Sequence, residues 1–61
     1  MEKRWRNVLE EQVPYNTRLN VKTSEDVIIE NVIYDVKTKQ YEDYYSGERV
    51  MDKILFWDYV D

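Results

Sequence analysis

The sequence predicts one small domain of mainly β class, built as an antiparallel meander of four strands. Three observations lead to this fold. Residues 26–36 form the longest run dominated by β-branched side chains, residues 17–23 alternate between apolar and polar side chains, and residues 53–60 are rich in aromatic and aliphatic ones. Polar turn residues separate these segments. The class becomes α+β if residues 1–13 form a helix.

The length of 61 residues allows a single domain, residues 1–61, with an N-terminal helix or arm over 1–14 and a β-meander over 17–60. A chain this short buries only about 60% of the surface that its unfolded state exposes. It has no cysteine for a disulfide and no histidine for the common zinc sites. Aromatic residues make up 15% of the sequence and supply large side chains for a core instead.

The N-terminal segment allows two structures. A helix would place five residues on one face, with spacings of three and four: Met1, Trp5, Val8, Leu9 and Gln12. Because no N-cap residue precedes them and a short helix is marginal in water, an extended arm anchored by Trp5 is the alternative. Pro14 ends either structure, since it disfavours the helical conformation of the residue before it.

Residues 17–36 predict an antiparallel hairpin. In residues 17–23, Leu19 and Val21 point to one side and polar side chains to the other, and residues 24–26 supply the turn. Residues 26–36 form the central strand, in which neither side is wholly polar. Its even-numbered side carries Ile28, Val32, Tyr34 and Val36, and its odd-numbered side carries Val27, Ile29 and Ile33.

Two further strands complete the meander. Residues 40–45 predict a more exposed strand, followed by a tight turn at Gly47 and a short extension at residues 49–51. Residues 53–60 predict the last strand, and the four strands curl partly into a barrel of SH3 type with the N-terminal segment across one opening. The apolar residues of the last strand fall on both sides, with Ile54, Phe56 and Val60 opposite Leu55, Trp57 and Tyr59.

The order of these landmarks resembles a group of short, uncharacterised domains that are common in phages and prophages. Those domains begin with a Trp, a nearby Val and a Pro, continue through two strands and close on a His-Trp-Met-Pro motif. The counterparts here are Trp5, Val8, Pro14, the hairpin of residues 17–36 and residues 56–59, without the histidine and the closing proline. The resemblance implies an accessory protein of phage type with a β-meander.

The side chains offer little for catalysis. Without histidine and cysteine, the chain lacks the commonest general base and the commonest activated thiol, and no serine lies in a glycine-rich elbow. Neighbouring carboxylates such as Glu10 and Glu11 would point to opposite sides of a strand. A single glycine makes no phosphate-binding loop, and no EF-hand spacing occurs. We therefore expect no enzyme activity, no cofactor and no metal ion.

The charge is distributed unevenly along the chain. Residues 1–23 carry five basic and three acidic side chains, whereas residues 24–61 carry four basic and ten acidic ones. The acidic part favours a protein partner with a basic surface over nucleic acid. Lys3, Arg4 and Arg6 beside Trp5 form the one cluster with the composition of a nucleic-acid site, and a solvated arm explains it equally well.

The sequence also predicts a soluble protein without membrane attachment. No apolar run approaches the roughly 20 residues that span a bilayer, and the first residues lead into no signal segment. We expect a cytoplasmic protein, in the cytoplasm of the host cell if a phage encodes it.

The tract of residues 41–45 is the most suggestive candidate site, because it places tyrosines between carboxylates. This composition suits contact with a basic protein surface. In an alternative interpretation, the tyrosine rings cover the core while the carboxylates keep the edge of the sheet soluble. The predicted partner-binding residues are this tract and two further glutamates: Glu30, Tyr41, Glu42, Asp43, Tyr44, Tyr45 and Glu48.

These observations favour a non-enzymatic accessory protein that binds and modulates, as an inhibitor, a host or defence protein. Two alternatives stay open. An oligomer of the chain would enclose a small ligand between Tyr, Trp and Arg side chains, or the last strand would add to the sheet of a partner in a larger assembly.

Overall fold

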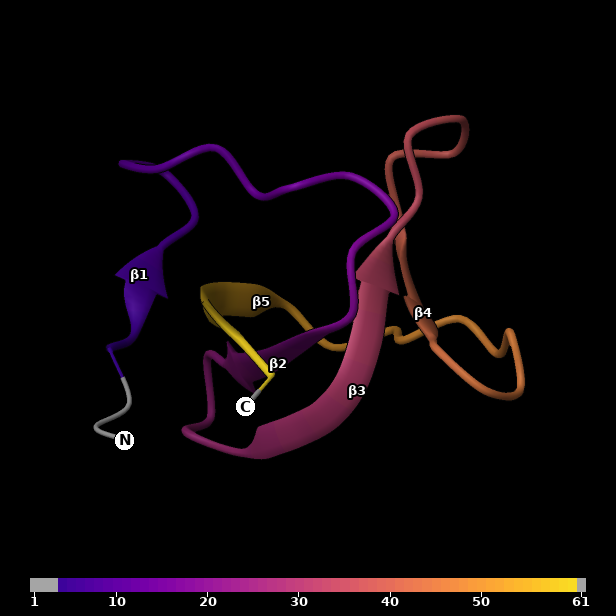
Figure 1. The fold of residues 1–61 in the computed structure, drawn as a ribbon. Coiled ribbons are helices and arrows are strands. Elements are labelled where there is room, and N and C mark those ends of the chain that lie inside the picture. Colours follow the sequence, from indigo (N-terminus) through magenta and orange to yellow (C-terminus); the bar gives the residue numbers. More distant parts are fainter. Residues whose placement is uncertain (1–3, 61) are drawn as a thin grey trace.

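The computed structural model describes residues 4–60, which form one open antiparallel sheet of five strands (Figure 1). The strands lie in the order β1-β5-β2-β3-β4 across the sheet. Their bounds are Arg6–Asn7 (β1), Leu19–Thr23 (β2), Ile28–Tyr34 (β3), Tyr41–Asp43 (β4) and Ile54–Tyr59 (β5). The predicted mainly β class and antiparallel architecture are confirmed, with five strands in place of four. Within the described residues there is no helix of the length and apolarity needed to cross a membrane.

The predicted hairpin is present as β2 and β3. The backbone N–H of Thr23 donates to the carbonyl of Val27 (2.9 Å), and the hydroxyl of Thr23 accepts from the N–H groups of Glu25 and Val27. Asp26 completes the turn with a φ of 67°, a conformation that aspartate tolerates better than most residues. The polar residues of this turn therefore close the hairpin as their composition predicts.

A β-bulge in β3 interrupts the expected alternation of its side chains. Two residues, Glu30 and Asn31, lie opposite Asn20 of β2, because the register shifts by one between the flanking pairs. Asn31 has a φ of 59°, and its N–H donates to Oδ1 of Asn20 (3.2 Å). The extra residue moves the core-facing positions from odd to even numbers. The simple division of β3 into an even and an odd side was therefore wrong, and its core-facing residues are Ile29, Val32 and Tyr34.

β5 lies beside β2 and does not follow β4 in the sheet. It pairs with β2 from Tyr59 opposite Leu19 to Ile54 opposite Thr23. The predicted central strand, now β3, is therefore an interior strand, and the middle of the sheet is β2. Every residue of β2 except Lys22 is buried, so β2 is also the most covered strand of the sheet.

A second register shift changes which residues of β5 share a face. The pairing with β2 shifts by one between Phe56 and Ile54, which leaves Leu55 as an extra residue. Ile54 and Trp57 are consequently both buried in the core, although alternation predicted them on opposite sides. The last strand has apolar residues at both odd and even positions partly because this bulge brings Ile54 and Trp57 to the same face.

The N-terminal segment forms an extended arm, and the helix considered for residues 1–13 is absent from the described part of it. β1 pairs with β5 at Phe56 and Trp57, after which the chain makes a single turn. Asn7 directs this turn, because its carbonyl accepts from the N–H of Glu10 and its side-chain oxygen from the N–H of Leu9. Leu9 is 89% exposed, so the apolar spacing that suggested a helix does not reflect a buried face.

The core lies between the arm and the sheet. Among the described residues it consists of six buried side chains from the arm, β2, β3 and β5: Val13, Leu19, Val21, Val32, Ile54 and Trp57. Five half-buried side chains pack against it: Val8, Ile29, Tyr34, Tyr41 and Val50. No buried side-chain nitrogen or oxygen within residues 4–60 lacks a hydrogen-bond partner. Aliphatic residues and one tryptophan therefore hold this small domain together.

β4 is shorter than the strand predicted over residues 40–45. It pairs with β3 at three positions, and its other side contacts the chain near Arg49 through an isolated bridge to Glu42. The N–H of Val50 donates to the carbonyl of Tyr41 (2.8 Å), so the short extension predicted at residues 49–51 covers the outer side of β4.

Candidate functional site

A tight turn follows β4, and we call residues 43–48 the β4 tip. Oδ1 of Asp43 accepts hydrogen bonds from the N–H groups of Tyr45 (2.8 Å) and Ser46 (2.9 Å). The carbonyl of Asp43 accepts from the N–H of Gly47 (3.0 Å), whose φ of 78° suits a residue without a side chain. One aspartate thereby fixes the path of the chain that carries three other predicted contact residues, Tyr44, Tyr45 and Glu48.

The carboxylate of Asp43 stabilises this turn through its hydrogen bonds to the backbone. The backbone hydrogen bonds from Ser46 and Tyr45 hold the pKa of Asp43 below its ordinary value, because they stabilise the ionised form. Asp43 therefore shapes the turn that carries Tyr44 and Tyr45.

Tyr44 and Tyr45 are the exposed aromatic residues of the β4 tip. Tyr44 is 48% exposed and Tyr45 is 71% exposed. Their rings meet edge to face, with the ring centroids 5.0 Å apart. The guanidinium carbon of Arg18 lies 5.6 Å from the ring centroid of Tyr44, and Nη1 of Arg18 lies 3.2 Å from the hydroxyl of Tyr45. Two aromatic rings and a cation thus form one ordered cluster at the surface.

Tyr41 lies on the other side of the sheet and belongs to the core. Its ring stands 4.6 Å from that of Tyr34, which stacks in turn on Tyr15 at 5.5 Å. Burial, and then the neighbouring Tyr34, raise the pKa of Tyr41 to about 12. The tyrosine tract is therefore divided, with Tyr41 covering the core as the alternative interpretation predicts, while Tyr44 and Tyr45 face solvent and their contact with a partner stays a prediction.

Three predicted contact residues are glutamates without a salt bridge in the described part of the chain: Glu30, Glu42 and Glu48. Glu42 lies on β4 and Glu48 at the end of the β4 tip. Glu30 lies in the bulge of β3, which the β4 tip reaches because the N–H of Tyr44 donates to the carbonyl of Asn31 (2.8 Å). These three glutamates thus lie on β4, on the β4 tip and on the adjoining bulge of β3.

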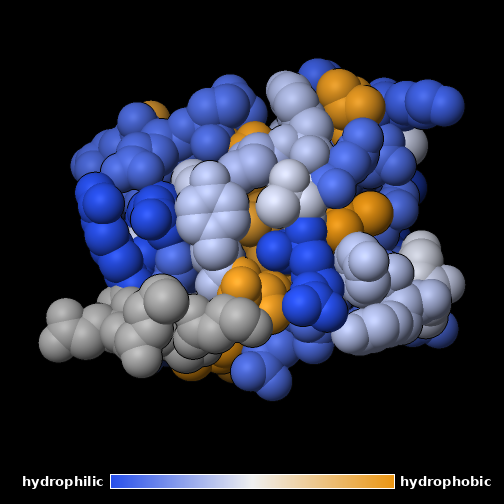
Figure 2. Space-filling model, viewed as in Figure 1, coloured by the Kyte–Doolittle hydropathy of each residue, from blue (hydrophilic) through white to orange (hydrophobic). Residues whose placement is uncertain are grey.

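The face of the molecule in Figure 2 is mostly hydrophilic, and hydrophobic residues appear on it only as small, separate areas. Such a surface favours contacts led by charge and by single aromatic side chains over contacts through a broad apolar patch.

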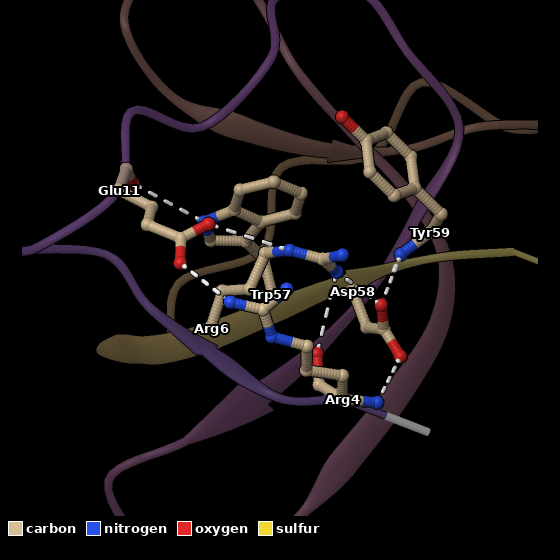
Figure 3. Close-up of polar contacts among 6 residues, drawn as sticks. All are labelled: Arg4, Arg6, Glu11, Trp57, Asp58 and Tyr59. Atoms are coloured by element: carbon tan, nitrogen blue, oxygen red, sulfur yellow. Dashed lines mark hydrogen bonds and ion pairs between the residues drawn. The ribbon is translucent and has the colours of Figure 1, made fainter. Parts of the chain in front are cut away.

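A second cluster of charged and aromatic residues joins the N-terminal arm to β5 (Figure 3). Nη1 of Arg6 lies 2.5 Å from Oδ1 of Asp58, and Nε of Arg6 lies 3.4 Å from a carboxylate oxygen of Glu11. The guanidinium carbon of Arg6 is 5.0 Å from the ring centroid of Trp57 and 5.1 Å from that of Tyr59. We call these five residues the Arg6 cluster. Sequence reasoning missed it, because no local pattern connects two charges 52 positions apart.

Asp58 is the acceptor at the centre of the Arg6 cluster. Besides the guanidinium of Arg6, its carboxylate accepts from the backbone N–H groups of Arg4 (2.9 Å) and Tyr59 (2.8 Å). Burial acts to raise the pKa of Asp58, but the two backbone hydrogen bonds and Arg6 together lower it below its ordinary value. The cluster therefore holds the arm on the sheet.

The salt bridges of the arm involve the basic residues beside Trp5, which have the composition of a nucleic-acid site. Arg4 and Arg6 both pair with Glu11, and Arg6 also pairs with Asp58, so nearby carboxylates balance their charges. Lys3, the third member of that predicted cluster, lies outside the described residues. The aromatic ring of Trp5 lies 5.1 Å from the ammonium nitrogen of Lys22 on β2.

The described residues show no constellation suited to metal binding or to enclosure of a small ligand. No group of three or more Asp or Glu side chains within residues 4–60 could hold a metal ion, and their surface has no pocket. Comparisons of the chain with family models, with curated proteins and with solved structures found no match. The β4 tip, which combines two exposed tyrosines with nearby glutamates, is the candidate functional site.

Proposed function

We propose that the chain is a non-enzymatic binding domain that docks the β4 tip on a basic surface of a protein partner. As an accessory protein of phage type, it inhibits or otherwise modulates a host or defence protein by occupying that surface. The observation that carries this proposal is the pair of exposed tyrosines, fixed by the turn of Asp43, on elements that also carry or adjoin glutamates without a salt bridge among residues 4–60.

The ordered turn supports binding because it lowers the entropy cost. A tyrosine provides a large contact area with only two rotatable side-chain bonds, and a side chain that is already held loses little freedom on binding. The edge-to-face contact between Tyr44 and Tyr45 and the contacts of Arg18 hold both rings before any partner arrives. Aromatic residues of this kind are frequent energetic centres of protein interfaces.

The charges support a basic partner. Glu30, Glu42 and Glu48 carry negative charge and form no salt bridge with a basic side chain of the described residues. Residues 24–61 also carry ten acidic against four basic side chains, which would attract a basic surface over several ångströms. Charge of this kind accelerates association and selects the partner.

Capture of partners from a bacterial lysate, followed by affinity measurements with the purified partner, would test the proposal. The variant that replaces both Tyr44 and Tyr45 by serine should weaken binding by about 2 kcal/mol or more, roughly thirtyfold in Kd, as loss of an interface centre does. Leu9→Ser is the control, because Leu9 is even more solvent-exposed than either tyrosine but lies on the N-terminal arm. An unchanged Kd for the tyrosine variant would contradict the proposal.

A charge reversal tests whether the glutamates select a basic partner. Changing Glu42 and Glu48 to lysine should weaken binding and remove most of its dependence on salt, whereas Glu10→Lys on the arm should leave both unchanged. Binding by the unmodified chain should itself weaken as salt rises, because exposed charges are screened beyond about 10 Å at 0.1 M salt. Affinity that is indifferent to salt and to both reversals would show that charge does not select the partner.

A further inference from the structure

One half of β3 has no neighbouring strand on its outer side. β3 begins at Ile28, but β4 pairs with it only from Val32 onwards. The chain then turns away into the β4 tip, after a last hydrogen bond from the N–H of Tyr44 to the carbonyl of Asn31. Figure 1 shows β4 beside the arrowhead end of β3 only, while no strand follows the outer side of its other end. We call residues 27–30 the open edge.

The backbone of the open edge offers free hydrogen-bonding groups. The N–H of Thr23 donates to the carbonyl of Val27, which directs the backbone of Val27 towards β2. Because these groups alternate in direction along an antiparallel strand, the N–H and carbonyl of Ile28 point away from β2. Within residues 4–60, Ile28 has a pairing partner only on the β2 side, at Lys22. An edge of this kind is a template for an added strand.

The side chains of the open edge combine apolar surface with negative charge. Val27 is 52% exposed and Ile28 49%, and Glu30 is also exposed. Asp26 precedes the edge with a side chain that is 86% exposed, and Lys22, its salt-bridge partner, is largely covered. The edge therefore suits a strand that presents cations to Glu30 and Asp26 and an apolar side chain to Val27.

We propose that the partner supplies an extended segment, with basic and apolar residues in alternation, that adds to the open edge as a further strand. This inference rests on the proposed function and names the part of the partner that the chain binds. The free N–H and carbonyl of Ile28 provide the backbone hydrogen bonds, Glu30 selects basic side chains on one face, and the adjoining Tyr44 contacts the end of the segment.

A second copy of the chain is a poorer occupant of the open edge. Antiparallel pairing of two copies about Ile28 would place Asp26 of each copy opposite Glu30 of the other. Pairing about Ile29 would place Ile28 of each copy opposite Glu30 of the other. Like charges directly opposite each other destabilise a sheet, and a glutamate opposite an isoleucine gains no compensating contact. The acidic residues thus protect the edge from self-association and leave it open to a basic segment.

A labelled nine-residue peptide of alternating lysine and valine is the probe, with a glutamate–valine peptide as its matched control. Fluorescence anisotropy would measure the Kd of each for the unmodified chain, Ile28→Pro and Ile28→Ala. Proline removes the outward N–H of Ile28 without removing a hydrogen bond to β2, whereas alanine keeps that N–H. We expect Ile28→Pro to weaken binding of the lysine–valine peptide about tenfold or more, and Ile28→Ala to change it by less than about threefold.

Two measurements keep the test decisive if Ile28→Pro fails to fold. The lysine–valine peptide methylated on alternate backbone nitrogens should lose affinity for the unmodified chain, because it can no longer donate to the open edge. Amide hydrogen exchange at Ile28 should slow at least about tenfold when the unmodified peptide binds. Binding without protection of Ile28, equal binding of the glutamate–valine peptide, or a dimer in light scattering that blocks the peptide would each overturn the inference.

The outcomes also separate this inference from the proposed function. If variants of Tyr44 and Tyr45 abolish binding of the protein partner but Ile28→Pro has no effect on it, docking through the β4 tip stands and strand addition is wrong. If Ile28→Pro abolishes binding while the tyrosine variants and the charge reversals do not, the proposed role of the β4 tip fails and the open edge alone carries the interaction.

Discussion

Replacing Asp58 by asparagine tests how firmly the Arg6 cluster joins the arm to the sheet. The asparagine keeps one acceptor oxygen but loses the charge, so the guanidinium of Arg6, 17% exposed, loses its nearest counterion. Removal of one partner from a fully buried ion pair costs about 3–5 kcal/mol. Because Glu11 stays 3.4 Å from Arg6 and is itself 45% exposed, part of the interaction survives. We therefore expect a loss of about 2 kcal/mol in the free energy of unfolding.

This loss is large for a domain of this size, whose total stability is on the order of 3–9 kcal/mol. Urea unfolding followed by tryptophan fluorescence would measure it, because Trp57 lies in the same cluster. Asp52→Asn is the matched control, since Asp52 is exposed and forms no salt bridge within residues 4–60. If both variants unfolded at the same urea concentration as the unmodified chain, the cluster would contribute nothing measurable and the reasoning would be refuted.

The pH dependence provides an independent check of the same residue. Since the pKa of Asp58 is lower in the folded than in the unfolded state, its contribution is fully present above the unfolded value and is lost as pH falls through the folded one. The unmodified chain should therefore lose stability below about pH 4 more steeply than Asp58→Asn does. Parallel curves for the two proteins would show that Asp58 has no special interaction in the fold.

Two further predictions concern the tyrosine stack and the bulge. Because burial raises the pKa of Tyr41 to about 12, an ultraviolet titration should show a tyrosine that ionises near pH 12, and Tyr41→Phe should remove that step. Its stabilising contribution is present below the unfolded pKa of about 10 and is lost as pH rises above it, so Tyr41→Phe should flatten the alkaline part of the stability curve. Asn31→Val should cost about 1–2 kcal/mol in urea unfolding, because a β-branched residue resists a φ of 59°, whereas Asn31→Gly should cost less. Equal costs for the two substitutions would show that the backbone conformation at the bulge is not strained.

The parts of the fold that the sequence predicted are those decided by neighbouring residues. The hairpin of β2 and β3 follows from the alternation around Leu19 and Val21 and from the polar turn after Thr23. The bulges could not be predicted, because each depends on a partner strand that the local pattern does not identify. At Leu55 and at Asn31 a single extra residue reverses which side chains face the core, so simple alternation fails from there onwards.

The remaining differences come from contacts between distant parts of the chain. The position of β5 beside β2 and the attachment of β1 to β5 depend on pairings such as Arg6 with Asp58, which no spacing rule reveals. For the candidate site, the composition of residues 41–45 pointed to the tract but could not tell which of its tyrosines face the core and which face solvent. The structure separates them, because Tyr41 lies on the core side of a very short strand, whereas the chain turns at Asp43 and leaves Tyr44 and Tyr45 exposed.

The position of β5 between β1 and β2 also determines when the domain can fold during synthesis. The middle strand of the sheet is made early, but one of its two neighbours, β5, is made after all the other strands of the sheet. Until residue 59 has emerged from the exit tunnel, the hairpin of β2 and β3 has one side of its sheet unpaired and the arm has no strand to pair with. Residues 4–60 are therefore expected to remain largely unstructured until β5 is available and then to complete their fold in a single cooperative step.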